Sequence, residues 1–286
     1  MTVCFIGAGP GDPDLVTMRG LSRIREADII VYAGSLVNPA LLEHARRGAE
    51  VLDSASMTLE QVTDVYRRHA AEPGLIARLH TGDPSIYGAV QEQIDFCRGA
   101  GISIEVVPGV SSVSAAAAAL EQELTLPGIS QTVILSRAAG RTPVPAGEDL
   151  VRVAATGSTL ALFLSVQRMG EVAETLMTAL PADTPVAVVY RASWPEQTIL
   201  RGTLSTIAAG VREAGIDRQA VVIVGRVLAG AYERSRLYDP GFSHGFRRGS
   251  VTGAEGEVGR AGGDDGGKDD ADGVGEDADA SGREDR

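Results

Sequence analysis

Two segments of the chain end apolar runs in turns of glycine, proline and small polar residues. The first covers residues 79–88 (LHTGDPSIYG) and the second covers residues 106–112 (VVPGVSS). Such segments present backbone and hydroxyl groups at the carboxyl end of a strand, where open α/β sheets bind their ligands. The chemistry that these residues favour is therefore the binding of a small molecule.

Each segment also has a purely structural interpretation. The TGDP sequence at 81–84 is common turn chemistry, and taken alone it fits an ordinary turn slightly better than a site. Ser111 and Ser112 suit the N-cap of a helix, a role that is compatible with ligand binding. The position of the TGDP turn directly after the apolar stretch 75–79 favours a functional site.

A glycine-rich loop at residues 7–12 (GAGPGD) invites a dinucleotide-binding interpretation. That fingerprint needs glycine at its sixth place, where this chain has Asp12, and Pro10 lies inside the turn. An acidic residue at the start of the following helix also repels a pyrophosphate. The loop therefore disfavours NAD binding, and a nicotinamide-dependent reductase is a weak alternative.

Short β-rich runs alternate with helical patterns through the first half of the chain. We expect strands at 3–6, 29–32, 50–52, 75–79 and 104–107, and helices at 14–26, 38–45, 58–71, 89–98 and 112–120. This alternation is typical of a parallel sheet covered by helices.

The segment 125–129 (TLPGI) breaks the pattern and marks a predicted boundary between domains 1–124 and 125–232. Beyond it we expect strands at 132–135, 159–164, 185–190, 197–201 and 220–224, and helices at 167–179 and 206–213. The stretch 185–201 has the pattern of a hairpin, so this second sheet is predicted to be mixed. The fold class is α/β.

The C-terminal end of the chain differs in composition from the body. Residues 255–286 carry 12 acidic and 4 basic residues, and thus most of the formal net charge of −12. The segment 250–286 has almost no large apolar residue, cannot offset its chain entropy by burial, and is predicted to be a disordered acidic tail. A protein-binding tail is the alternative. No nucleic-acid partner is expected.

Residue usage excludes several kinds of chemistry. Lys268, the only lysine, lies in the tail, which excludes a Schiff base, a lysine general base and a phosphate-loop lysine from the body. Cys4 and Cys97 lie in apolar patterns and are expected to be buried, reduced thiols. The four histidines lack ligand spacing, so no protein-bound metal is expected. No signal pattern or long apolar run occurs, which predicts a cytoplasmic protein without membrane contact.

Residues 4–17 (CFIGAGPGDPDLVT) and 32–39 (YAGSLVNP), taken with the two strand-end segments, resemble the tetrapyrrole methylases, which use S-adenosylmethionine. The likeness covers roughly residues 1–230. Relatives that methylate uroporphyrinogen usually carry Asp after the tyrosine of the second motif, where this chain has Ala33. The chain is therefore most similar to the branch of the family that methylates C-11 of precorrin-4.

The resemblance implies two αβα domains with an active-site trough between them, a homodimer, and methyl transfer from S-adenosylmethionine to C-11 of precorrin-4, giving precorrin-5 and S-adenosylhomocysteine. It assigns cofactor contacts to Pro10, Thr81, Gly82, Asp83, Ile86, Ser111, Ser112, Phe163, Leu164 and Ala192. Weaker candidates for binding the carboxylate-rich substrate are Gly11, Asp12, Ser35, Arg137 and Arg191. No catalytic residue is assigned. Cobalt-precorrin-4 as substrate, another ring position and a cofactor-binding regulatory module remain open alternatives.

Overall fold

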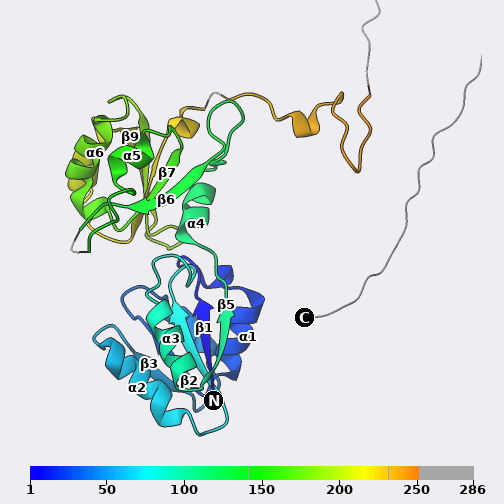
Figure 1. Ribbon diagram of the computed structural model, residues 1–286, viewed down its shortest axis with the longest axis vertical. Coiled ribbons are helices and arrows are strands. Elements are labelled where there is room, and N and C mark those ends of the chain that lie inside the picture. Colours follow the sequence, from blue (N-terminus) through cyan, green and yellow to red (C-terminus); the bar gives the residue numbers. More distant parts are fainter. Residues whose placement is uncertain (141, 231, 251–286) are drawn as a thin grey trace, which may run out of the picture. The chain divides into compact units, whose positions relative to one another are not determined.

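The computed structural model describes residues 1–140, 142–230 and 232–250 of the 286 residues (Figure 1). Met1–Ser235 form one compact unit, and the described residues from Arg236 to Ser250 belong to a second, which contains the 3₁₀ turn η5 (Arg236–Tyr238). The predicted acidic tail, 250–286, lies outside the described residues except for Ser250. The predicted boundary after residue 124 falls inside the first unit and stays a prediction.

The first sheet has five parallel strands in the order β3-β2-β4-β1-β5. Its strands are β1 (Thr2–Gly7), β2 (Ile29–Tyr32), β3 (Glu50–Asp53), β4 (Leu75–His80) and β5 (Ser103–Val107). The connections between them contain α1 (Met18–Glu26), α2 (Leu59–His69) and α3 (Gln91–Gly99). The predicted parallel sheet is confirmed, and every predicted strand lies within one of these strands.

Both faces of the first sheet are buried, which is why its strands read as continuous apolar runs. Phe5 and Ile76 pack on the face covered by α2 and α3, against Tyr66. Ile6 packs on the opposite face against Ile24 of α1. With its faces covered, the sheet leaves the carboxyl ends of its strands to form a site.

Two of the helices expected from the sequence take a different form in the structure. The helix expected over 14–26 begins only at Met18, because Thr17 is extended and its side chain accepts a hydrogen bond from the N–H of Gly20. The residues before it form the 3₁₀ turn η1 (Pro13–Leu15). The stretch expected as a helix over 38–45 is the 3₁₀ helix η2 (Pro39–His44), whose N-cap Asn38 also donates to the carbonyl of Gly11 at 2.8 Å. That bond ties η2 to the glycine-rich loop.

The second sheet is mixed, with the order β6-β7-β10-β8-β9. Its strands are β6 (Val133–Arg137), β7 (Thr159–Phe163), β8 (Pro185–Tyr190), β9 (Thr198–Thr203) and β10 (Ala220–Val224). Strands β6 and β7 are parallel, whereas β10 is antiparallel to β7 and β8, and β8 and β9 form the predicted hairpin. The helical segments are α5 (Leu150–Ala154), η3 (Val166–Arg168), α6 (Met169–Met177), α7 (Ile207–Glu213) and η4 (Arg226–Ala229). The sequence pattern missed α5, which has only five residues.

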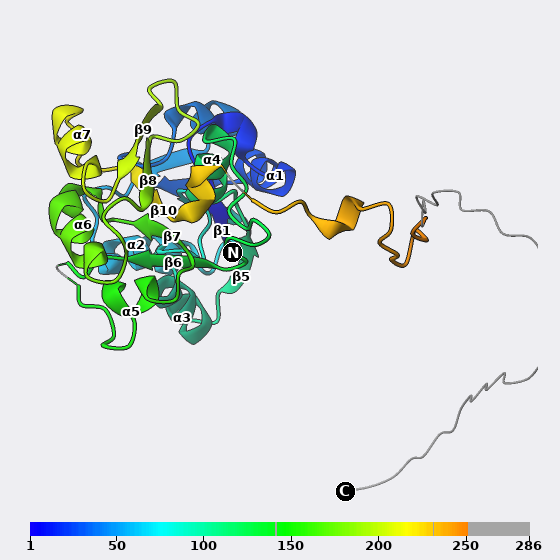
Figure 2. The ribbon, with the colours of Figure 1, turned by 90° about the horizontal axis from the view of Figure 1, so that it is seen from above.

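Helix α4 (Ser112–Ala119) packs on the second sheet, although it directly follows the last strand of the first. Its small side chains Ala115 and Ala116 share a core with Ala161 and Ala187 of β7 and β8. Helices α5, α6 and α7 cover the opposite face of that sheet (Figure 2). The N-terminus of α4 therefore lies where the chain passes from one sheet to the other.

Both cysteines are buried and unpaired. Burial raises the pKa of the Cys4 thiol to about 12 and that of Cys97 to about 11, so both remain protonated at neutral pH. Within the described part of the chain, no helix is long and apolar enough to cross a membrane.

Candidate functional site

A cavity of about 950 Å³ is lined by loops at the carboxyl ends of the first sheet and by residues of the second half of the chain. Its volume is in the range of small-molecule sites. The residues assigned to the cofactor by resemblance all line it, namely Pro10, Thr81, Gly82, Asp83, Ile86, Ser111, Ser112, Phe163, Leu164 and Ala192. Of the weaker substrate candidates, Ser35 and Arg191 line it, whereas Gly11, Asp12 and Arg137 do not.

Three loops of the first sheet meet backbone to backbone at the base of this cavity. The N–H of Gly82 donates to the carbonyl of Gly9 at 2.7 Å, and the N–H of Gly9 donates back to Gly82 at 3.3 Å. A Cβ on Gly109 would overlap the carbonyl oxygen of Gly82 and lie 2.6 Å from the Cα of Gly7. Glycine is required at Gly7 and Gly109 because no side chain fits between these backbones.

Gly82 differs from the other glycines of this junction because a Cβ there would not overlap its neighbours. Its φ is +64°, and a Cβ there would meet nothing closer than 3.7 Å. A ligand can therefore approach its backbone closely. Ser111, the N-cap of α4, accepts a hydrogen bond from the N–H of Val113 at 3.4 Å and also lines the cavity, so capping and site formation coexist in one residue.

The carboxylate of Asp83 holds two loops together. Its Oδ1 accepts hydrogen bonds from the N–H of Ser85 at 2.8 Å and from the Ser85 hydroxyl, and its Oδ2 accepts from the N–H of Gly109 at 2.9 Å. Burial alone would raise the pKa of Asp83, but these hydrogen bonds outweigh it and lower the pKa. Asp83 therefore stays ionised and is engaged in shaping the loops.

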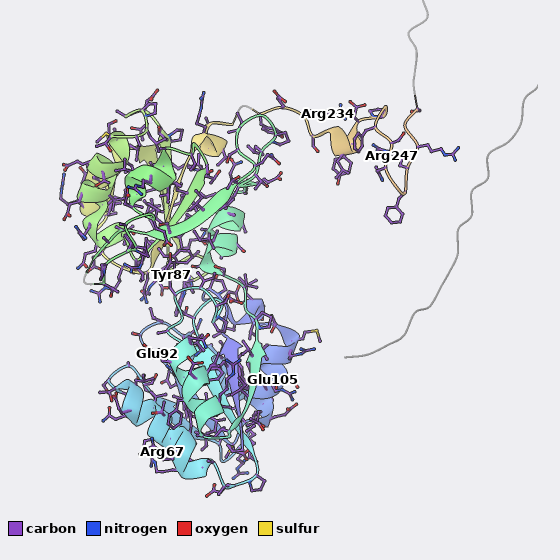
Figure 3. The ribbon with its side chains drawn as sticks, in the orientation of Figure 1. Arg67, Tyr87, Glu92, Glu105, Arg234 and Arg247 are labelled. Carbon is purple, nitrogen blue, oxygen red and sulfur yellow. The ribbon has the colours of Figure 1, made fainter. Side chains whose placement is uncertain are left out.

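Several residues that line the cavity have an unusual backbone conformation. Leu164, at the end of β7, has φ +50° and leaves 76% of its side chain exposed. Tyr87, labelled in Figure 3, has φ +53°, and its ring lies 5.1 Å from that of Phe163. Arg191 and Gln219, which also line the cavity, share this positive φ. Non-glycine residues in this conformation store strain and gather at functional sites.

The substrate candidates outside the cavity make other contacts. The guanidinium of Arg137 donates to the carbonyls of Thr142 at 3.0 Å and Pro143 at 2.8 Å, and so binds its own loop. The N–H of Asp12 donates to the Ser193 hydroxyl at 3.0 Å, and its side chain caps η1. Gly11 packs beneath an indole ring from the β8–β9 turn. These contacts favour structural roles.

The cavity-lining residues that sequence reasoning missed include Tyr87, Trp194 and Gln219. Trp194 is the only tryptophan of the chain, and that rarity was the one signal available for it. Nothing in the sequence distinguished Gln219 from a surface residue. Tyr87 lies in the segment 79–88, but the resemblance assigned no role to it.

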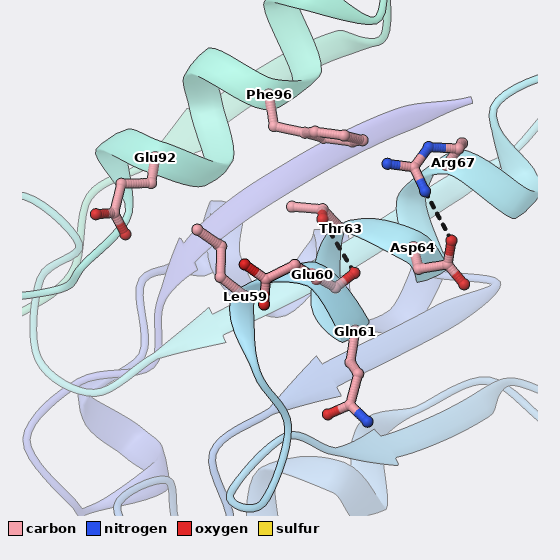
Figure 4. Close-up of a pocket in the computed structure, with 8 residues that line it drawn as sticks. All are labelled: Leu59, Glu60, Gln61, Thr63, Asp64, Arg67, Glu92 and Phe96. Carbon is pink, nitrogen blue, oxygen red and sulfur yellow. Dashed lines mark hydrogen bonds and ion pairs between the residues drawn. The ribbon is translucent and has the colours of Figure 1, made fainter.

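A second hollow, of about 600 Å³, lies between α2 and α3 (Figure 4). There Arg67 pairs with Asp64 at 2.8 Å and lies over the Phe96 ring, 5.2 Å from its centre. None of the predicted site residues lines it. The larger cavity is therefore the candidate site.

Asp83→Asn is expected to lower the melting temperature at neutral pH, because an amide cannot accept all the hydrogen bonds that the carboxylate accepts. The pKa of Asp83 is lowered in the folded protein, so its stabilising contribution is present above the unfolded pKa of about 3.9 and is lost as the pH falls through the folded pKa. The difference between variant and wild type should therefore shrink below about pH 4. Calorimetric melting from pH 7 to pH 3 tests this, and a difference independent of pH would contradict it.

Residues 2–208 match the family Tetrapyrrole (Corrin/Porphyrin) Methylases. The chain is 50% identical over 248 residues to the cobalt-precorrin-4 C(11)-methyltransferase of Methanocaldococcus jannaschii, covering 86% of this chain and 96% of the relative. It is 48% identical to the precorrin-4 C(11)-methyltransferase of Pseudomonas aeruginosa, covering 87% of this chain and 100% of that protein.

Solved structures agree with the fold. An X-ray structure of a cobalt-precorrin-4 methyltransferase has a TM-score of 0.78 at 46% identity, covering 79% of this chain and 95% of that one. A uroporphyrin-III C-methyltransferase from Thermus thermophilus, in complex with S-adenosylhomocysteine, has a TM-score of 0.69 at 28% identity, covering 80% of this chain and 99% of that one.

Proposed function

Because the chain belongs to the tetrapyrrole (corrin/porphyrin) methylase family, we propose that it transfers a methyl group from S-adenosylmethionine to C-11 of precorrin-4, in cobalamin biosynthesis. The products are precorrin-5 and S-adenosylhomocysteine. The observation that carries this proposal is the convergence of strand-end loops and the apolar residues Phe163 and Leu164 on one cavity. The proposal is supported by the relatives named precorrin-4 or cobalt-precorrin-4 C(11)-methyltransferase, which match this chain over almost their whole length.

The residues of the cavity suit a nucleoside that carries an amino acid. Gly82 lines the cavity without a side chain, so its backbone and the hydroxyls of Thr81 and Ser111 can approach polar parts of the ligand. Leu164 and Phe163 offer the apolar surface that an adenine ring prefers. These residues would hold S-adenosylmethionine.

The bound sulfonium supplies a methyl group that is already activated for transfer. The protein's contribution is then to fix the substrate carbon and the methyl group about 3 to 3.5 Å apart and to exclude water. Arg191 is the candidate for holding a substrate carboxylate, because it lines the cavity and carries a guanidinium, which in this structure lies 3.4 Å from the carboxylate of Glu196. No residue is assigned as a general base.

The test is incubation with labelled S-adenosylmethionine and a panel of precorrins, each with and without cobalt, followed by location of the label in the product. Relatives with both substrate names match at similar identity, so metal-free and cobalt-loaded precorrin-4 are both assayed. Label at C-11 of either one supports the proposal. Label at another ring position, or none, contradicts it.

The protein is expected to bind S-adenosylmethionine and S-adenosylhomocysteine and not NAD(H). Asp12 stands at the sixth place of the fingerprint and caps the 3₁₀ turn η1, where its carboxylate accepts a hydrogen bond from the N–H of Asp14 at 2.9 Å. The glycine-rich loop therefore does not lead directly into an α-helix as a dinucleotide fold requires. Isothermal calorimetry with each ligand measures this. Binding of NAD and none of S-adenosylhomocysteine would refute it.

A homodimer is expected from the resemblance, and the nearly neutral body of the chain does not oppose association by charge repulsion. Light scattering at micromolar concentration should give twice the chain mass of 29.7 kDa. A mass equal to that of one chain would count against the dimer.

A further inference from the structure

The turn between β8 and β9 presents the only tryptophan of the chain, Trp194, to the cavity. The N–H of Trp194 donates to the carbonyl of Arg191 at 2.9 Å, and the N–H of Gln197 donates to the carbonyl of Trp194 at 3.0 Å. Ser193, with φ +70°, donates its N–H to the side chain of Gln197 at 2.8 Å. The turn is therefore tightly fixed, and it orients the indole ring.

One side of Trp194 contacts the glycine-rich loop of the first sheet. The indole Nε1–H donates to the backbone carbonyl of Pro10 at 3.0 Å. The ring lies so close to Gly11 that a Cβ there would overlap it, lying 2.8 Å from Cε2. A second bond, from the N–H of Asp12 to the Ser193 hydroxyl, runs beside it at 3.0 Å. Pro10 is a proposed contact of the methyl donor.

The other side of Trp194 contacts Arg191, the proposed contact of the substrate. The guanidinium carbon of Arg191 lies 5.2 Å from the centre of the Trp194 ring, within the range of a cation–π interaction. Its Nε donates to Oε1 of Gln219 at 2.9 Å, and Gln219 in turn donates to the carbonyl of Ser35 at 2.7 Å. Arg191 is thereby held in one orientation.

Trp194 is not a member of the hydrophobic cores of the described chain. Its ring is half-buried at the cavity. Trp194 contacts Pro10 and Arg191, which are proposed to bind ligands, and it belongs to none of the cores that stabilise the sheets.

We propose that Trp194 is a positioning residue for both sides of the cavity. Its indole N–H fixes the Pro10 carbonyl on the methyl-donor side, and its ring fixes the Arg191 guanidinium on the substrate side. The proposal rests on the proposed function. Because the N–H contacts Pro10 and the ring contacts Arg191, substitutions of Trp194 can separate the effect on the methyl donor from the effect on the substrate.

Trp194→Phe keeps a ring over Arg191 and removes the N–H. We expect it to weaken S-adenosylhomocysteine binding by about 3- to 10-fold, the range of one lost hydrogen bond, and to change KM for precorrin-4 by less than about twofold. Trp194→Leu removes both contacts and should weaken S-adenosylhomocysteine binding and raise KM by about 5-fold or more. Calorimetry gives the first quantity and steady-state kinetics the second.

Gly11→Ala perturbs the same contact from the other side, because its Cβ must push the indole ring away. Gly11→Ala should reproduce the effects of Trp194→Leu, although the indole N–H and the ring of Trp194 are both still present. The double variant should be no worse than Trp194→Leu alone, because residues that act through one contact are not additive.

Phe96→Leu is the matched control. It also removes an aromatic ring that lies 5.2 Å from an arginine, but on α3 outside the cavity. It should leave both S-adenosylhomocysteine affinity and KM unchanged. Melting temperatures of all variants show whether a loss of binding comes from unfolding.

The proposal is overturned if Trp194→Phe and Trp194→Leu both keep wild-type affinity and KM, or if they have identical effects on both quantities. Additive effects of Gly11→Ala and Trp194→Leu would overturn it as well. These outcomes leave the proposed function standing, provided that the wild type binds S-adenosylhomocysteine and methylates precorrin-4. A wild type that does neither refutes the proposed function itself, and this proposal with it.

Discussion

Gly82→Val is expected to abolish binding of S-adenosylhomocysteine while leaving the fold largely intact. Gly82 has φ +64°, a conformation that a β-branched residue adopts only with strain. A Cβ at this position would make ordinary contacts, 3.7 to 3.9 Å from backbone atoms of Ser112, Ser111 and Val110, so two further methyl groups would crowd the turn where it lines the cavity. Calorimetric titration measures the loss, and circular dichroism reports whether the fold persists.

Gly82→Ala is the control that separates strain from occlusion. It carries the conformational cost of the positive φ, about 1 kcal/mol, without filling the cavity. It should therefore lose much less affinity than the valine variant. Asp83→Asn does not serve as a second control for the cavity, because it also disturbs the loops: the Asp83 carboxylate accepts a hydrogen bond from the N–H of Gly109. Wild-type affinity in a folded Gly82→Val variant would mean that the ligand binds elsewhere.

The strands were predictable because burial on both faces leaves an unambiguous pattern. The stretch 29–32 was predicted as β2 (Ile29–Tyr32), and 220–224 as β10 (Ala220–Val224), with no error in their bounds. Helix boundaries were less accurate where local hydrogen bonds compete with the apolar period. The Thr17 cap shortened the helix expected from residue 14, and the segment capped by Asn38 is a 3₁₀ helix.

The candidate site was predictable only in part. The loops that contain Gly82 and Ser111 carry motifs, and the structure brings them to one cavity. Trp194 and Gln219 could not be found in this way, because their role depends on contacts with residues more than 180 positions away. The positive φ of Leu164 was also invisible, since nothing in a leucine indicates that conformation. Sequence motifs identify loops, but only tertiary contacts identify their partners.

Gly109→Ala is expected to destabilise the protein by about 2 to 3 kcal/mol, and so to lower its melting temperature by roughly 5 to 10 °C. The added Cβ would overlap the carbonyl oxygen of Gly82 and lie 2.6 Å from the Cα of Gly7. Both neighbours are backbone, so no side-chain rotation relieves the overlap. The loops must separate, and the hydrogen bond from the N–H of Gly109 to Asp83 lengthens with them.

Gly170→Ala provides the comparison, because Gly170 lies inside α6 and a Cβ there meets nothing within 4 Å. That substitution should raise stability by about 0.5 to 1 kcal/mol, since alanine loses less backbone entropy in a helix. Thermal melting of both variants tests the pair, and equal melting temperatures for Gly109→Ala and wild type would contradict the close approach of the loops. Because the displaced backbone includes Gly82, the Gly109 variant should also bind S-adenosylhomocysteine more weakly at temperatures where it remains folded.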